Sequence, residues 1–346
     1  MLDTDWSLEL KNCTFVKTVL MVLVVLYHCC VFWTGNWFSK NPLITSQEIG
    51  MFSQWLNSFH IYSFFFVSGY LFSYGKFEAG KYDSLKRFCT TKIKRLLIPY
   101  CFVLIVWVIP WAVIVNRYSF HDVIVRYLLG DNPNQLWFLL VLFWVQIIGF
   151  FLIPSLKKSN RLVLVIFFLT YVSGNYLESH FLNFLQIFSA IRCFAFFGFG
   201  CFFRESNSFR TNAYKINSLV YVVLDVILFF IYRHGLYNGW NSILVSAIEF
   251  LLRMFGAIMG FIVLQRIAKV VEWDKRKVLR VLANYSMPIY LFHQQLVYLL
   301  IILLNGKINP YMHVIINFIV VFFASLLISV FMSKFRTTRF LIGEKN

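Results

Sequence analysis

The run KTVLMVLVVLYH, residues 17–28, is almost entirely apolar between two ionisable ends, a pattern typical of a membrane-spanning helix. Ten positions separate Lys17 from His28, and all are apolar except Thr18 and Tyr27. On an α-helix eleven steps close to within about 20° of whole turns and rise roughly 16 Å. Lys17 and His28 therefore share one helix face. If Lys17 lies at one lipid boundary, His28 lies near the middle of a hydrocarbon layer about 30 Å thick.

An ionisable side chain at that depth is costly, and it therefore indicates a functional site at His28. The alternative is a structural histidine whose ring is hydrogen-bonded to a neighbouring helix. Both interpretations of His28 remain open on this stretch alone.

The whole chain has the composition of a membrane protein. Of its 346 residues 60% are hydrophobic and 14% are charged, whereas a soluble domain has roughly 25% charged residues. The N-terminus is acidic and shows no cleavable signal, which favours a retained first helix. Seven cysteines form no CxxC pair, so that neither a disulfide framework nor a metal site is expected.

Ten apolar stretches are long enough to cross a bilayer, which predicts an all-α, polytopic membrane protein with about ten transmembrane helices. No linker or composition shift divides the chain, and we expect one integral-membrane domain over residues 1–346 with no attached soluble domain. The stretches lie at roughly 14–33, 53–74, 96–115, 135–153, 161–175, 185–203, 217–232, 242–265, 285–304 and 313–333.

A net charge of +17 is compatible with nucleic-acid binding, but the location of the basic residues indicates a membrane protein instead. They gather in alternate loops, most densely between positions 76 and 95, and the positive-inside rule assigns those loops to the cytoplasm. With ten spans, both termini are then cytoplasmic. We expect contact with membrane lipids and none with nucleic acid.

Further charged side chains fall inside the expected spans. Arg192 and Asp225 lie at similar depths and are expected to pair, while Glu249 and Arg253 are four residues apart and share a helix face. For both pairs a structural ion pair is the favoured interpretation, and a role in substrate binding is the alternative.

The second span carries His60 at a depth similar to that of His28, so that two imidazoles could line one cavity. Gly69, deeper in the same span, is expected to permit close helix packing. The run KIKRLLIPY, residues 92–100, then places a basic cluster of Lys92, Lys94 and Arg95 at the cytoplasmic membrane edge. Such a cluster contacts anionic lipid in most proteins, and the alternative is a cradle for the phosphates of a cytosolic cofactor.

Five motifs in order resemble the acyltransferase 3 family, integral-membrane enzymes that modify cell-surface polysaccharides and related glycans in bacteria. The resemblance covers nearly the whole chain. The motifs are the Lys17-to-His28 spacing, FHIYSFFFVSGYLF at 59–72, KRLLIPY at 94–100, LWFL at 136–139 and SMPIYLFH at 286–293.

The resemblance implies an enzyme of the bacterial inner membrane that moves an acyl group, most often acetyl, from cytosolic acetyl-CoA to a sugar hydroxyl. The acceptor would be a surface or capsular polysaccharide or its lipid-linked precursor. Catalysis would fall to His28 with Lys17, and cofactor binding to Lys92, Lys94 and Arg95. His60 is a further candidate catalytic residue because of its depth. Lysine stands at 17 and 94 where relatives commonly have arginine. Arginine can form two parallel hydrogen bonds to a carboxylate or phosphate, whereas lysine offers a single point charge.

Histidine suits this reaction because a sugar hydroxyl is a poor nucleophile and needs a base that works near neutrality. Direct transfer and an acyl-histidine intermediate both remain possible. Candidate donors to the oxyanion are His60, Arg253 and Gln294, and Arg192, Glu249, Arg253 and Gln294 are candidate substrate or structural polar residues. A transporter or flippase of a polar lipid-linked solute is the alternative function.

Overall fold

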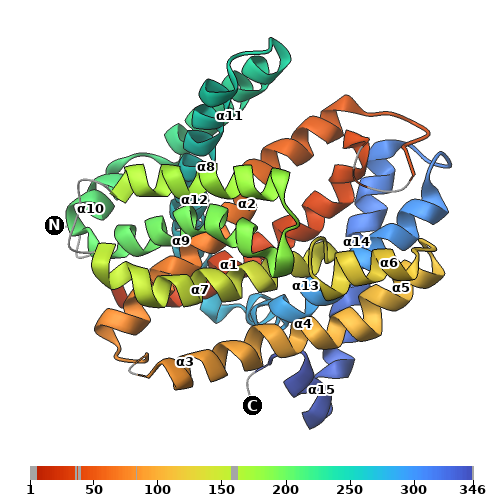
Figure 1. Cartoon of the computed structure of the whole chain (residues 1–346), viewed down its shortest axis with the longest axis horizontal. Helices are drawn as coiled ribbons and strands as arrows, with labels where there is room; N and C mark the ends of the chain where they lie inside the picture. Colours follow the sequence, from red (N-terminus) through yellow and green to blue (C-terminus); the bar gives the residue numbers. More distant parts are fainter. Residues whose placement is uncertain (1–5, 36, 38–39, 83, 157–162, 345–346) are drawn as a thin grey trace.

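The computed structural model describes residues 6–35, 37, 40–82, 84–156 and 163–344 of the chain, and every regular element within these ranges is a helix. The all-α prediction is thereby confirmed. Figure 1 shows the helices in one continuous body, with α1 (Trp6–Cys30) near its middle.

Each of the ten expected spans falls on a helix. The third span is one joined helix made of α3 (Leu85–Lys92), η3 (Ile93–Leu97), α4 (Ile98–Val103), η4 (Leu104–Val108) and α5 (Ile109–Ile114). The other nine spans correspond to α1, α2 (Gln47–Ser73), α7 (Trp137–Leu156), α8 (Val163–His180), α9 (Ile187–Glu205), α11 (Ser218–Tyr237), α12 (Ser242–Val271), α13 (Lys277–Leu304) and α14 (Pro310–Met332). Within the described ranges eight helices are long and apolar enough to span a membrane, and α2 and α8 are not among them. The number of crossings and the side of the termini stay predictions.

Shorter helices connect these spans. They are η1 (Val31–Thr34), η2 (Tyr74–Glu78), α6 (Phe120–Val123), η5 (Ile124–Leu128), η6 (Asn134–Leu136), η7 (Phe184–Gln186), α10 (Asn207–Lys215), η8 (Trp273–Lys275) and α15 (Arg336–Leu341). Among the long helices, α1 packs against α2, α12, α13 and α14, and α9 packs against α2, α7 and α8. Helix α11 packs on α12 and projects from the body at the top of Figure 1.

Helices α2 and α9 meet at two glycines. A Cβ on Gly69 would lie 1.8 Å from the carbonyl oxygen of Phe197, and one on Gly200 would lie 2.0 Å from that of Phe66. No side chain fits between the two backbones, and small residues at such crossings let helices approach closely in membranes. The expected packing role of Gly69 is therefore confirmed.

The joined helix from α3 to α5 contains two wide turns, η3 and η4, each of which ends one residue before an Ile–Pro pair at Pro99 or Pro110. Proline lacks the N–H for the usual helical bond and its ring collides with the preceding turn. A π-turn accommodates this, because the amide before each proline bonds a carbonyl five residues back. The second wide turn carries Trp107, whose Nε1 donates to the Phe292 carbonyl at 3.2 Å and ties this helix to α13.

Candidate functional site

His28 on α1 lies against His293 on α13. The His28 Nδ1 and His293 Nε2 atoms are 2.9 Å apart, and the ring centroids are 4.8 Å apart. His293 is fully buried, whereas His28 is half-buried. The ring of His28 thus has a hydrogen-bond partner on a neighbouring helix, as the structural interpretation requires, but this partner is itself an ionisable group.

A third imidazole lies close to this pair. Tyr27 contacts both His28 and His60, with a ring centroid separation of 5.0 Å in each case. The Nδ1 atom of His60 is 2.5 Å from the Leu56 carbonyl oxygen one turn earlier on α2, and only 2% of His60 is exposed. The structure therefore brings His28, His60 and His293 together from three helices.

Aromatic rings extend from the histidine pair. The Trp37 ring lies 5.5 Å from that of His28 and 4.9 Å from that of Tyr298, and Trp111 lies 6.5 Å from Tyr298 at an angle of 27°. Gln294 donates its Nε2 to the Tyr298 hydroxyl. The Oε1 of Gln294 and the Nε1 of Trp111 are buried without a hydrogen-bond partner among the described residues, so that both atoms remain able to bind a polar ligand.

Sequence reasoning did not single out Trp37, Trp111 or Tyr298. Trp37 lies in the connection after α1, and the other two lie in apolar runs rich in aromatic residues. His293 was visible as the last residue of SMPIYLFH, but no spacing rule places it beside His28, 265 residues earlier in the sequence.

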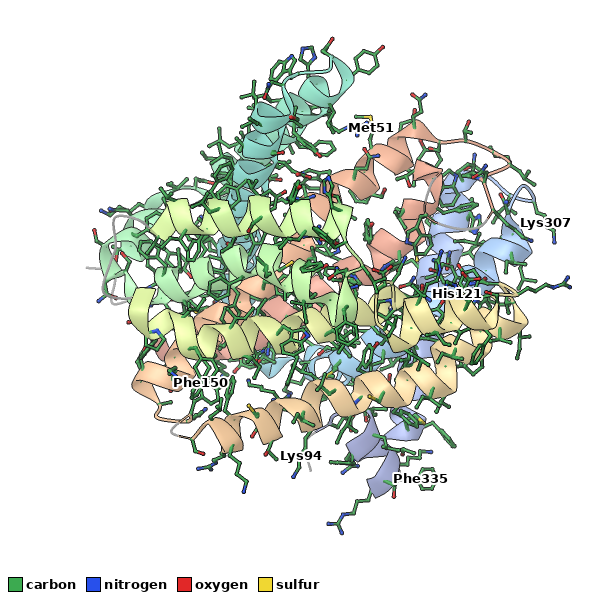
Figure 2. The ribbon with its side chains drawn as sticks, viewed as in Figure 1. Met51, Lys94, His121, Phe150, Lys307 and Phe335 are labelled. Atoms are coloured by element: carbon green, nitrogen blue, oxygen red, sulfur yellow. The ribbon has the colours of Figure 1, made fainter. Side chains whose placement is uncertain are left out.

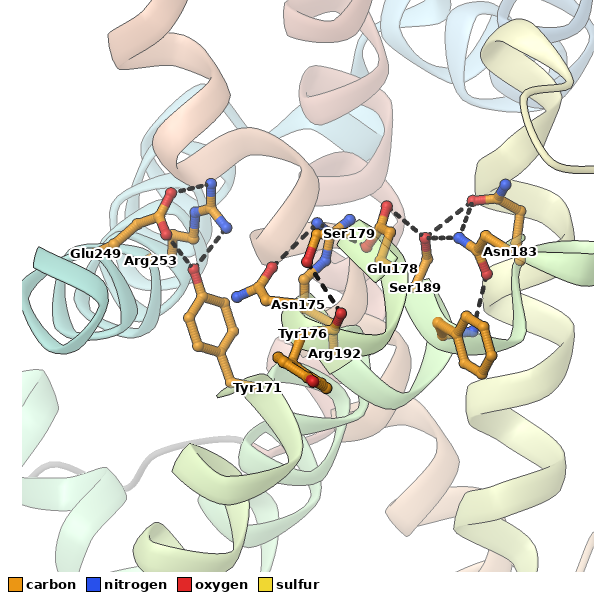
Figure 3. A network of polar contacts seen from close by, with 12 residues as sticks. Tyr171, Asn175, Tyr176, Glu178, Ser179, Asn183, Ser189, Arg192, Glu249 and Arg253 are labelled. Carbon is orange, nitrogen blue, oxygen red and sulfur yellow. Dashed lines mark hydrogen bonds and ion pairs between the residues drawn. The ribbon is translucent and has the colours of Figure 1, made fainter. Parts of the chain in front are cut away.

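Figure 3 shows a second polar region built by α8, α9 and α12. Glu249 Oε1 and Arg253 Nη2 are 2.5 Å apart, which confirms the ion pair expected from their spacing. Tyr171 donates its hydroxyl to Glu249 at 2.7 Å and accepts from Arg253 at 2.7 Å, and Tyr232 donates to Glu249 at 3.0 Å. This closed arrangement is typical of a structural pair that makes two charges tolerable in an apolar surrounding.

The expected pair of Arg192 and Asp225 is wrong. Arg192 instead pairs with Glu178 at 3.0 Å, because α8 approaches its backbone closely at Gly174, where a Cβ would lie 2.4 Å from the Arg192 nitrogen. Asp225 accepts a hydrogen bond from Trp55 on α2 at 2.9 Å. Similar depth did not predict which neighbour each side chain contacts. The rotation of a residue about its helix axis decides which neighbouring helix it faces.

Both arginines thus have a carboxylate partner of their own. Among the described residues no hydrogen bond or ion pair of this region reaches His28 or His293. These contacts separate the polar region of Figure 3 from the histidine pair and favour the structural interpretation of its charges.

The three residues of the basic motif do not all face the same way. The Lys92 amine lies 5.1 Å above the rings of Tyr82 and Phe88 and donates to the Tyr82 hydroxyl at 3.4 Å. Its charged neighbours are Arg95 and Lys17. Lys17 is thereby grouped with the basic residues at the other end of α1 from His28.

Lys94 lines a separate cavity of about 370 Å³ on the outer side of α3. Figure 2 shows Lys94 at the edge of the molecule. In the sequence, Lys86 and Arg87 served only to assign their loop to the cytoplasm. The structure places both residues in this cavity. Three cations and three hydroxyls line it: Lys86, Arg87, Lys94, Ser84, Thr90 and Thr91.

A larger cavity of about 660 Å³ lies between α2 and α11, with Met51 and the apolar face of α11 on its walls and Arg233 and His234 among its lining residues. None of the predicted site residues lines it. The described residues contain no cluster of three or more His, Cys, Asp or Glu side chains that could hold a metal ion.

A family model described as an acyltransferase domain matches residues 11–334, a range that contains the three histidines, the basic motif and the cavity on α3. No curated protein and no solved structure matches the chain.

Proposed function

Since this chain belongs to the acyltransferase 3 family, it is a membrane acyltransferase, and we propose that it transfers acetyl from cytosolic acetyl-CoA to a sugar hydroxyl. The acceptor is a surface or capsular polysaccharide, or its lipid-linked precursor, of a bacterium whose inner membrane holds the enzyme. The observation that carries this proposal is the half-buried imidazole of His28, held at one nitrogen by His293 and surrounded by aromatic rings.

In the proposed reaction the sugar hydroxyl oxygen attacks the thioester carbonyl carbon while His28 takes the hydroxyl proton. The tetrahedral intermediate then collapses, the carbon–sulfur bond breaks, and His28 returns the proton to the departing thiolate. The products are the sugar ester and free CoA thiol, with no net proton taken up. Direct transfer is preferred because it needs no second covalent intermediate.

The oxyanion of the intermediate needs hydrogen-bond donors. Arg253 is a poor candidate because Glu249 and Tyr171 already occupy its guanidinium, and His60 is poor because its Nδ1 faces the Leu56 carbonyl. Trp111 Nε1 is a better candidate, since it is a buried donor without a partner among the described residues. Gln294 keeps a free acceptor, which suits a sugar hydroxyl.

The transfer itself is tested with acetyl-CoA that carries carbon-14 in the acetyl group. We expect membrane vesicles that contain the protein to place the label on glycan as a base-labile ester, and vesicles without the protein to show none. Unmodified glycan or lipid-linked sugar that crosses the vesicle membrane without gaining label would instead support the transporter or flippase.

The cavity on α3 is proposed to hold the phosphates of CoA, with Lys92, Arg95 and Lys17 along the path of the donor toward the membrane. Replacing Lys86 and Lys94 together by glutamine is expected to raise KM for acetyl-CoA about 10- to 100-fold, because two charge-assisted contacts are lost. The kcat should change little, since these contacts are equal in ground and transition states. Initial rates in nanodiscs at varied acetyl-CoA measure both constants.

The matched control for this change is the pair Lys277→Gln and Lys334→Gln, which removes the same charge from exposed positions on α13 and after α14. An equal rise of KM in both double variants would mean that net charge, rather than this cavity, attracts the donor. An unchanged KM in the Lys86 and Lys94 variant would place the phosphates elsewhere.

A further inference from the structure

We propose that His293 is a positioning residue that fixes the tautomer of His28, so that Nε2 of His28 is the nitrogen that accepts the hydroxyl proton. This inference rests on the proposed function for its catalytic meaning, but the assignment of the tautomer is argued from geometry alone. Three groups lie in a row: the Tyr290 carbonyl oxygen, the His293 ring and the His28 ring.

The first step is the contact between His293 Nδ1 and the Tyr290 carbonyl oxygen, which are 2.7 Å apart. A carbonyl oxygen has no proton to donate, so that a contact this short requires a proton on the nitrogen. The spacing of three residues on α13 places the ring against the carbonyl one turn earlier, which makes this contact a local consequence of the sequence YLFH.

The second step follows from the count of protons. A neutral imidazole carries one N–H, and in His293 that proton is on Nδ1, so that Nε2 is an acceptor. The atom 2.9 Å from it is His28 Nδ1, which must therefore donate. His28 then carries its own single proton on Nδ1, and its Nε2 keeps a lone pair.

A charged His293 would reverse these roles, because Nε2 would then donate to His28 Nδ1. His293 has no exposed surface, and its hydrogen-bond partners among the described residues are the backbone of Tyr290 and of Ile289 and the imidazole of His28. A full charge there would be buried without a carboxylate, which is strongly unfavourable. The neutral pair is the arrangement that satisfies both rings.

The consequence for the reaction is twofold. The Val24 backbone on α1 is a further hydrogen-bond partner of His28. His293 adds the acceptor on the neighbouring helix that holds His28 in the tautomer able to accept a proton at Nε2. After proton transfer the positive charge of His28 is shared through Nδ1–H with His293 and the Tyr290 carbonyl. This is the role that a carboxylate performs in a serine–histidine–aspartate triad, here carried by a neutral ring backed by a backbone oxygen.

The first test compares His293→Leu with His293→Gln. Leucine removes the acceptor, and kcat is expected to fall about 100-fold with KM for acetyl-CoA unchanged. Glutamine offers a carbonyl oxygen at a similar reach and should recover most of the lost rate. His313→Leu is the matched control, because His313 is also buried on a helix that packs on α1 but contacts Phe32 and Trp33 instead of His28.

Equal losses in the leucine and glutamine variants, or a loss that appears in KM alone, would overturn the positioning role.

The second test reads the tautomer directly, by nitrogen-15 NMR of ring-labelled histidine in nanodiscs, with the His28 signals assigned by their absence in His28→Gln. A protonated Nδ1 and a bare Nε2 in the His28 ring are expected, and loss of that single tautomer in His293→Leu. A bare Nδ1 on His28 would refute the inference.

The two proposals fail separately. A protein that transfers no acetyl at all, yet shows the expected His28 tautomer, would refute the proposed function and leave the assignment of the tautomer intact. A wild-type protein that transfers acetyl but carries a bare Nδ1 on His28 would refute the assignment of the tautomer and leave the proposed function intact.

Discussion

Replacing His28 by alanine or by glutamine is expected to lower the rate of acetyl transfer about 1,000-fold while the protein remains folded in the membrane. The ring supplies the only base of the proposed mechanism, and neither replacement can take the hydroxyl proton. Glutamine keeps most of the side-chain volume, so that a loss shared by both variants is chemical rather than a result of repacking. Proton NMR of the glycan O-acetyl signal in cells, together with rates in nanodiscs, measures the effect.

The matched control is His121→Ala, which removes an exposed histidine on α6. An unchanged acetyl signal in the His28 variants would remove this residue from the mechanism. The same proteins also separate direct transfer from an acyl-enzyme. When acceptor is withheld, we expect no carbon-14 acetyl bound to the wild-type protein, and label that depends on His28 would establish the covalent route instead.

Replacing Gly69 by alanine is expected to destabilise the protein by about 3 kcal/mol or more. The added Cβ would lie 1.8 Å from a carbonyl oxygen of α9, and backbone cannot give way as a flexible side chain can. The two helices must move apart, and the contacts on either side of the crossing are lost with them. Thermal unfolding in detergent, followed by size-exclusion chromatography, gives the change in stability.

Gly235→Ala on α11 is the matched control for this prediction. A Cβ there would meet the ring of Trp240 at 2.9 Å, and Trp240 is exposed and can move aside. Equal thermal shifts for the two variants would mean that the α2–α9 crossing does not limit stability.

Much of the fold could be predicted from the sequence, because every apolar stretch long enough to span became a helix. The ends of the helices were less accessible. The third span was expected at 96–115, but its helix begins at Leu85, and α1 begins at Trp6 rather than near position 14. In both cases the added turns are polar, and hydrophobicity cannot detect a helix that continues beyond the lipid.

The site was predictable only where its contacts are local. Glu249 and Arg253 meet because four residues make about one helical turn. Arg192 and Asp225 do not meet, since the close approach at Gly174 gives Arg192 a different acid. The partner of His28 and the direction of Lys94 depend likewise on how distant helices pack, which no spacing within one helix contains.

The wide turn η3 affects how the two ends of the joined helix from α3 to α5 are oriented relative to each other. It is one residue longer than an ordinary helical turn, so that deletion of a single residue from 93–97 would leave a continuous helix. Because the wide turn takes up its additional residue within about one turn, that deletion would leave the helix beyond it in nearly the same orientation relative to Lys94. Trp107 and Trp111 would keep their contacts with α13 and Tyr298. A deletion from the ordinary turns of α4 would instead rotate both tryptophans by about 100° relative to Lys94. The wide turn is thus a place where this helix can change its length by one residue without changing the angle between its basic end and its aromatic end beside the histidines.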